Sequence, residues 1–161
     1  MIQNTYYYEY MYYNSYFSAT CNFDAKGNIM SLLYGDNFII QKDLSNTEYT
    51  FMRLFQNCNK LKSAKNLILP ATTLTNDCYN QMFDHCSGLT IAPELPATTL
   101  TDSCYSGMFH GCTSLIAAPE LPATTLNSYC YTGMFNTCTS LTTAPELPAT
   151  TLTRDCYQMM F

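Results

Sequence analysis

Several residue types are scarce in this chain of 161 residues. It has no tryptophan, two histidines and only 12% charged residues, with 7 Lys and Arg against 12 Asp and Glu. A net charge of −5 with so few basic residues leaves no clustered positive surface for nucleic acid or for an anionic membrane. No apolar run approaches the roughly 20 residues of a membrane span. We therefore expect no nucleic acid partner and no membrane insertion.

The first five residues contain no Lys or Arg and lead into a tyrosine run, which is unlike a secretory signal peptide. With no signal visible, the chain fits a cytoplasmic protein, a part released without a signal such as a virion component, or a fragment. The composition is 47% hydrophobic and 14% aromatic. That is too apolar for intrinsic disorder, and the length allows a sizeable core.

The sequence repeats every 26 residues. Leu-Pro-Ala-Thr-Thr-Leu begins at Leu69, Leu95, Leu121 and Leu147, and a cysteine recurs at Cys78, Cys104, Cys130 and Cys156. The unit reads LPATTLTxxCYxxMFxxCxxLxxAPE, and a degenerate earlier copy, two residues longer, precedes Leu69. One unit has too few large apolar side chains to offset the entropy of ordering it, so the copies are expected to stack as coils.

Two patterns alternate within each unit. Four apolar residues lie four apart, at Leu100, Cys104, Met108 and Cys112. This spacing predicts one face of a short helix, with Thr101 as its N-cap. Residues 113–118 then predict a short strand that Pro119 ends, because proline cannot donate to a strand ladder.

The run Cys-Tyr-x-x-Met-Phe-x-x-Cys-x-x-Leu with a proline-marked corner resembles the BspA-like leucine-rich repeat, whose usual unit is a few residues shorter and has Ala-Phe for Met-Phe. The likeness covers about residues 51–161. The period lies within the 20–29 residues of leucine-rich solenoids. The LPATTL form resembles arrays in surface proteins of gut bacteria and their phages, and residues 27–35 resemble the leader segment before such arrays.

We therefore expect an α/β repeat, a leucine-rich-repeat solenoid with one short strand and one short helix in each 26-residue coil. Residues 1–50 would form a non-repeating N-terminal cap, which terminal coils need to shield their core. Residues 51–161 would form a worn first coil, three full coils and a partial last coil. An uncapped last coil predicts either a longer natural chain or end-to-end self-association. The tyrosine run at 6–13 predicts an edge strand or, alternatively, an aromatic platform for sugars or a partner.

Nine cysteines suggest either buried free thiols or disulfides within or between coils. Zinc is disfavoured because seven residues separate Cys104 from Cys112, a poor spacing for a pair of ligands. His85 and His110 do not occupy equivalent repeat positions, and neither lies near a recognisable nucleophile turn. We expect no cofactor, no metal and no enzymatic activity.

Positions that differ between copies are the candidate binding residues. On the predicted strand these are Ile91, Ala117 and Thr143, and on the helix side Asp102, Ser103 and Ser106. One acidic residue per coil forms a column of Glu94, Glu120 and Glu146. This column predicts a solvated stripe or, alternatively, a site for Ca²⁺ or a basic partner.

The resemblance implies a non-enzymatic surface or adhesion role. The expected function is recognition of a protein or glycan through the solenoid surface. The alternative is a structural or host-recognition element of a phage particle or other assembly. Either role implies an extracellular, cell-surface or virion location for the complete protein.

Overall fold

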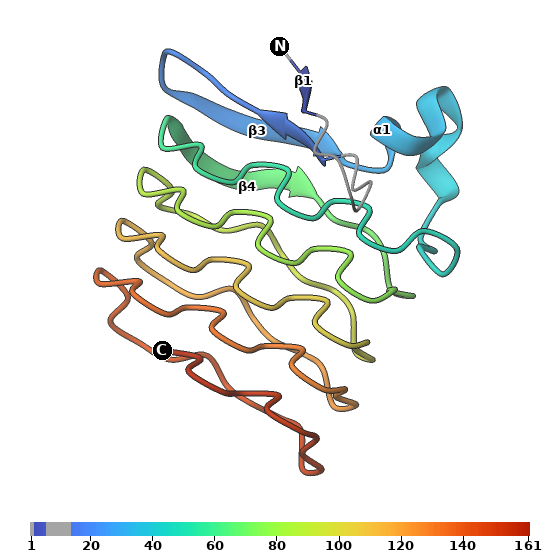
Figure 1. The fold of residues 1–161 in the computed structure, drawn as a ribbon, viewed down its shortest axis with the longest axis vertical. Helices are drawn as coiled ribbons and strands as arrows, with labels where there is room; N and C mark the ends of the chain where they lie inside the picture. The colour runs from blue at the N-terminus through green and yellow to red at the C-terminus, as the bar shows by residue number, and fades with distance from the viewer. Residues whose placement is uncertain (1, 6–13) are drawn as a thin grey trace.

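The computed structural model describes residues 2–5 and 14–161, and these form a stack of similar coils beneath a few regular elements (Figure 1). The elements are β1 (Ile2–Thr5), β2 (Asn14–Phe17), β3 (Phe23–Asn28), α1 (Ser31–Tyr34), the 3-10 helix η1 (Gly35–Ile40) and β4 (Leu61–Ile68). None of the described helices is long and apolar enough to cross a membrane. The tyrosine run at 6–13 lies outside the described residues.

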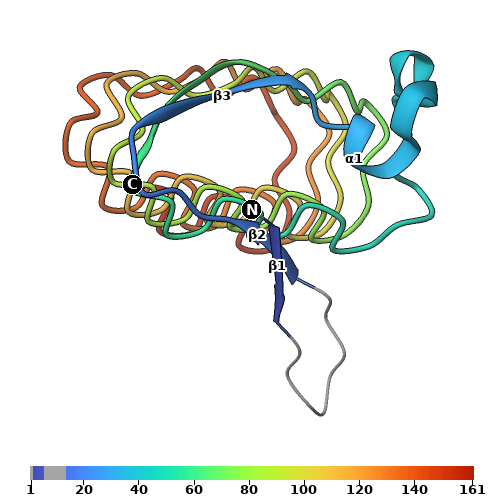
Figure 2. The ribbon, with the colours of Figure 1, turned by 90° about the horizontal axis from the view of Figure 1, so that it is seen from above.

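The N-terminal elements join the stack through a strand pair. β3 runs parallel to β4, with Phe23 opposite Leu61 and Asn28 opposite Ile68. β1 and β2 pair antiparallel with each other, Ile2 opposite Phe17, and Figure 2 shows this pair projecting from the outline of the coils. The strand pairing of β3 makes the N-terminal segment continuous with the first coil.

The N-terminal segment covers only part of the first coil. Ile29 and Met30, just after β3, are buried in the same apolar core as the coils. Ile39 and Ile40 in η1 are exposed and do not lie over the core, although residues 1–50 were expected to shield it. In Figure 2, α1 and the chain after it lie at one narrow end of the coil outline rather than across its middle.

Residues 26 apart in sequence lie over one another. The backbone N–H of Tyr79 donates to the carbonyl of Cys104 at 3.0 Å, and Tyr105 donates in the same way to Cys130 at 3.1 Å. Each amide donates to the carbonyl of the residue just before its own equivalent in the next coil, so the hydrogen bonds between coils recur with the sequence repeat. Figure 2 shows the coils superposed along the stack.

The core consists of columns of identical side chains. Successive rings stack nearly parallel, with centroids 5.3–6.0 Å apart, in one phenylalanine column and one tyrosine column. The columns are Phe55, Phe83, Phe109, Phe135 and Phe161, and Tyr79, Tyr105, Tyr131 and Tyr157. Offset ring stacking contributes about 0.5–1.5 kcal/mol per pair beyond the burial of area. Each coil thus covers the aromatic face of its neighbour.

The expected short helices in the coils are wrong. The described elements after residue 60 include only β4 and no helix. Where helices were expected, the chain forms a ribbon of consecutive turns, which we call the turn ribbon: residues 49–57, 75–87, 101–113, 127–139 and 153–160. These are the undulating segments in Figure 1.

Backbone geometry explains why a helix does not form. Every fourth residue has positive φ, as at Asp77, Gln81 and His85, and a right-handed helix cannot pass through such residues. Alternate amides then serve two purposes. Met82 donates to the carbonyl of Tyr79 within the turn, whereas Phe83 donates to the next coil. The four-residue apolar spacing therefore comes from turns and not from a helical face.

The expected strand at 113–118 is also wrong in its extent. Among the described residues, β4 is the one extended strand in the coils. In the coils that follow, the equivalent segments are joined by isolated parallel bridges. Ile91 bridges to Ser63 on one side and to Ala117 on the other. Pro119, like the other corner prolines, removes a backbone donor just after this point, which limits how far the ladder can extend.

Candidate binding surfaces

The first candidate surface is the outer side of the bridged segments, which we call the bridge face: Ser63, Ile91, Ile116, Ala117 and Thr143. Ile91 is 46% exposed and Ile116 is 59% exposed. Parallel bridges hold the backbone in register here, while the side chains at one position change from Ser63 to Ile91 to Ala117 to Thr143. The predicted residues Ile91, Ala117 and Thr143 are all exposed.

The second candidate surface is the corner ridge, formed by Glu94, Glu120 and Glu146 with their flanking prolines. All three carboxylates are exposed. Shallow hollows of about 420 and 450 Å³ lie between successive corners, each lined by two of these glutamates. A third hollow of about 520 Å³ adds Lys42 and Lys65 beside Glu94. The ridge therefore offers a repeated acidic edge, with basic side chains at its first hollow.

The remaining predicted residues lie on the turn ribbon and bond the neighbouring coil. The carboxylate of Asp102 accepts from the amide of Ser128 at 3.0 Å. Ser103 has positive φ and donates its amide to the carbonyl of Ser128, and the Ser106 hydroxyl donates to the carbonyl of Thr132 at 3.3 Å. The fold does not group these residues with the bridge face, and their polar atoms already serve the stacking of coils.

Three residues that the sequence analysis left without a role come together on the turn ribbon. Asp84 and His110 are equivalent positions in adjacent coils, and His85 follows Asp84. One carboxylate oxygen of Asp84 lies 2.6 Å from Nδ1 of His85 and 2.7 Å from Nδ1 of His110, and the two rings meet edge to face. Within the part of the chain that the structure describes, these three residues form the one group of His, Cys, Asp or Glu side chains whose ligand atoms lie close enough together to hold a metal ion.

The Asp84 carboxylate is held as an anion. Burial by itself would raise its pKa, but hydrogen bonds from Gln56, His110 and His85 outweigh burial and lower the pKa below the ordinary value. Gln56 donates from Nε2 to the second carboxylate oxygen at 2.7 Å. Because an ionised carboxylate only accepts, both histidine Nδ1 atoms must carry hydrogen in this arrangement.

The nine cysteines, all within the described residues, are unpaired, and Cys21 alone among them is exposed. Three thiols donate to carbonyls of the preceding coil. The distances are 2.9 Å from Cys86 to Phe55, 3.1 Å from Cys112 to Phe83 and 3.1 Å from Cys138 to Phe109. Burial raises the pKa of these three thiols, and it raises the pKa of Cys78 to about 12, so the buried thiols stay protonated and inert at neutral pH. The cysteine columns are structural.

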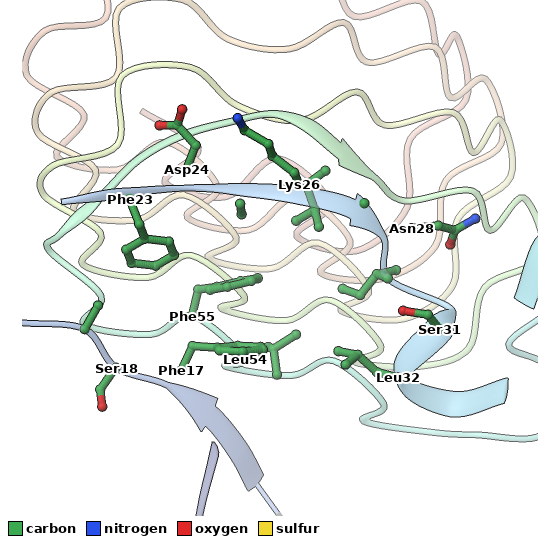
Figure 3. A pocket seen from close by; sticks show the side chains of 15 residues that line it. Phe17, Ser18, Phe23, Asp24, Lys26, Asn28, Ser31, Leu32, Leu54 and Phe55 are labelled. Carbon is green, nitrogen blue, oxygen red and sulfur yellow. The ribbon is translucent and has the colours of Figure 1, made fainter. Parts of the chain in front are cut away.

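An apolar pocket of about 370 Å³ lies at the N-terminal end of the stack. Phe17 stacks on Phe55 with centroids 4.9 Å apart. Figure 3 shows these rings together with Phe23 below β3, while Asp24 and Lys26 project from the strand's other side. The pocket is the space left where the N-terminal segment meets the first coil.

No family model matches this chain, and neither a curated protein nor a solved structure matches it.

Proposed function

We propose that this protein is a non-enzymatic recognition module that binds a protein or glycan through its extended outer surface. The stacked coils and the resemblance of residues 51–161 to the BspA-like leucine-rich repeat support its assignment as a solenoid of that kind. On this proposal the complete protein acts outside the cell, at a cell surface or on a virion. A repeat stack suits the role, because its surface lengthens with each coil while the core stays the same.

The bridge face is the observation that carries the proposal. Its backbone is registered by parallel bridges at Ile91 and Ala117, so outward side chains stand in columns of near-constant spacing, about 4.8 Å from strand to strand. The core columns repeat the same residues, whereas this face varies. Solvent-exposed isoleucines at 91 and 116 give it apolar contact area beside the polar corner ridge. Such a mixture suits recognition of a protein surface or the faces of a sugar chain.

Arrays of glycans and of host surface proteins would test the proposal. The matched variant replaces Ile91 with Ser and Ile116 with Thr, the residues present at the equivalent positions 63 and 142. We expect an array ligand whose affinity falls at least tenfold in this variant. Gln158→Ala, an exposed change on the turn ribbon, should bind like the parent chain. An empty array with folded protein, or equal affinity of both variants, would reject the proposal.

The alternative role, in an assembly, has its own candidate contact residues. Leu152, Met159 and Phe161 are exposed at the C-terminal end of the stack, and Phe161, which stacks on Phe135, has 56% of its surface in solvent. Docking of another copy or of an assembly partner on this end would continue the columns. Sedimentation velocity of this chain over a range of concentrations should show association that Met159→Glu with Phe161→Glu abolishes. A monomer at all concentrations would reject end-to-end docking.

A further inference from the structure

We propose that Asp84, His85 and His110 form a binding site for a divalent transition metal ion of the Zn²⁺ type, joining two adjacent coils. The three residues supply one carboxylate oxygen and two imidazole nitrogens, all within 4.8 Å of one another. Imidazole with carboxylate is a ligand set for zinc and related ions and a poor one for Ca²⁺, which takes oxygen ligands.

Two of the three separations between ligand atoms need only small changes to hold an ion. Zinc lies about 2.0–2.2 Å from nitrogen and oxygen ligands, so tetrahedral ligands stand roughly 3.3 Å apart. The carboxylate oxygen of Asp84 is now 2.6 and 2.7 Å from the two Nδ1 atoms, which must therefore open by about 0.6 Å. The His85 side chain is 55% exposed and has room to swing outward.

The metal would take the place of the two hydrogen atoms that now point at the carboxylate. A neutral imidazole frees its Nδ1 lone pair by moving the ring proton to Nε2, which leaves the proton count unchanged. Asp84 would bind through one oxygen of its carboxylate group. Three protein ligands leave a further position to water, since His110 and His85 both reach solvent and a zinc site with three protein ligands retains a water.

The surroundings hold the ligands in place before any ion binds. Asp84 is buried, and Gln56 fixes its second oxygen at 2.7 Å. This is the kind of outer partner that orients a metal-binding carboxylate. The amide of His85 donates to the carbonyl of His110 at 2.7 Å, which ties the two ligand backbones together. Gly111 leaves space for the His85 ring, because a Cβ there would come within 3.1 Å of it.

The repeat supplies the matched variants. Asn136 takes the place of His110 one coil further on, and Thr137 takes the place of His85 two coils further on, with Gly111 at the equivalent position between them. His110→Asn and His85→Thr therefore place residues that this backbone already accommodates, with the same positive φ at Thr137 as at His85. Their melting temperatures in chelator should stay close to that of the parent chain, which separates loss of metal binding from loss of fold.

Calorimetric titration with Zn²⁺, in a Cys21→Ser background to remove the exposed thiol, tests the site. We expect one ion per chain, micromolar or tighter affinity, and a rise in melting temperature with added zinc. Each histidine variant should weaken binding at least a hundredfold, and Gln56→Ala about tenfold. Unchanged affinity in either histidine variant, or no binding by the folded parent chain, would overturn the site.

Cobalt(II) gives a second readout that distinguishes these ligands from cysteine. Co²⁺ bound by imidazole and carboxylate should show weak visible bands without the intense thiolate charge-transfer band, and His110→Asn should abolish them. A thiolate band would show that the ion binds cysteines and would reject the proposal.

Discussion

Gly88 illustrates how a single residue depends on the neighbouring coil. The equivalent residues in the next two coils are Ser114 and Ser140. A Cβ on Gly88 would lie 2.2 Å from the carbonyl oxygen of Asn59 and 2.8 Å from Nζ of Lys62. The first coil, which is two residues longer than the others, places its backbone against Gly88. Serine, the residue found at this position in the other coils, therefore does not fit at position 88.

We predict that Gly88→Ser destabilises the protein although it restores the repeat. The backbone carbonyl of Asn59 cannot move aside as a flexible side chain would, so the free energy of unfolding should fall by about 2–3 kcal/mol. Urea denaturation measures this change. The matched control, Ser114→Gly, removes a half-buried side chain and should cost less than about 1 kcal/mol. Equal stability of Gly88→Ser and the parent chain would contradict the packing described for this junction.

The turn ribbon is the element in which sequence reasoning and structure differ most. Four residues advance an α-helix about 40° beyond a full turn, so three such steps still fit one broad apolar face. A run of a dozen residues therefore cannot separate a helix from turns that repeat every four residues. Positive φ at non-glycine residues such as Asp77 and Gln81 carries a local cost of about 1–2 kcal/mol each. Hydrogen bonds to the next coil offset this cost, and they exist only in the stack.

The phenylalanine column is a second structural element that can be tested, because its positions should contribute different amounts to the free energy of unfolding. Phe109 is fully buried between Phe83 and Phe135, with centroids 5.5 and 5.7 Å away. Phe109→Ala should lower the free energy of unfolding by about 3–5 kcal/mol, because it removes a packed ring and both stacking partners.

Phe161 gives the matched control for that measurement. It belongs to the same column but has one stacking partner and a largely exposed ring, so Phe161→Ala should cost about 1 kcal/mol or less. Thermal and urea unfolding of both variants compare the two positions directly. Similar losses at 109 and 161 would show that the rings do not form a continuous column.

For the molecule as a whole, the core is unusual in holding many titratable groups in their neutral form. Burial raises the pKa of Cys130 and of Cys138 to about 11, from an ordinary value near 9. Burial likewise raises the pKa of Tyr79 and Tyr105 well above the ordinary value. Folding thus depends on these groups remaining protonated.

We predict that stability is lost on the alkaline side. Between about pH 9 and 11–12 an unfolded thiol has released its proton while the folded thiol retains it. The folded state then binds more protons than the unfolded state, so the free energy of unfolding falls as pH rises through this window and is intact below it. Melting temperatures from pH 7 to 11 measure the effect. Cys130→Ala should flatten the decline and Cys21→Ala, at an exposed site, should not. A constant melting temperature up to pH 11 would contradict the burial of these thiols.

For the candidate surfaces, as for the fold, one part could be predicted from the sequence and another part could not. The exposure of Ile91 and Ala117 follows from the repeat, because residues that vary between copies rarely belong to a column of identical core side chains. Glu94 recurs unchanged at Glu120 and Glu146, and its exposure follows from its charge, since a carboxylate is rarely buried without a partner. The grouping of Asp84, His85 and His110 does not follow from the repeat. His85 and His110 occupy different positions of the unit, and nothing local indicates that a residue with positive φ turns its ring toward the coil below.

By itself, the sequence determined the 26-residue interval and the buried apolar positions at Leu100, Cys104, Met108 and Cys112, since residues that recur at a fixed interval occupy equivalent positions in stacked coils. Only the tertiary structure decided the backbone path inside each coil and the meeting of one carboxylate with two imidazoles. The physical reason is that half of the amide donors in the turn ribbon are satisfied by another coil. A pattern read along the chain contains local preferences, and it does not contain the hydrogen bonds that a neighbouring coil supplies.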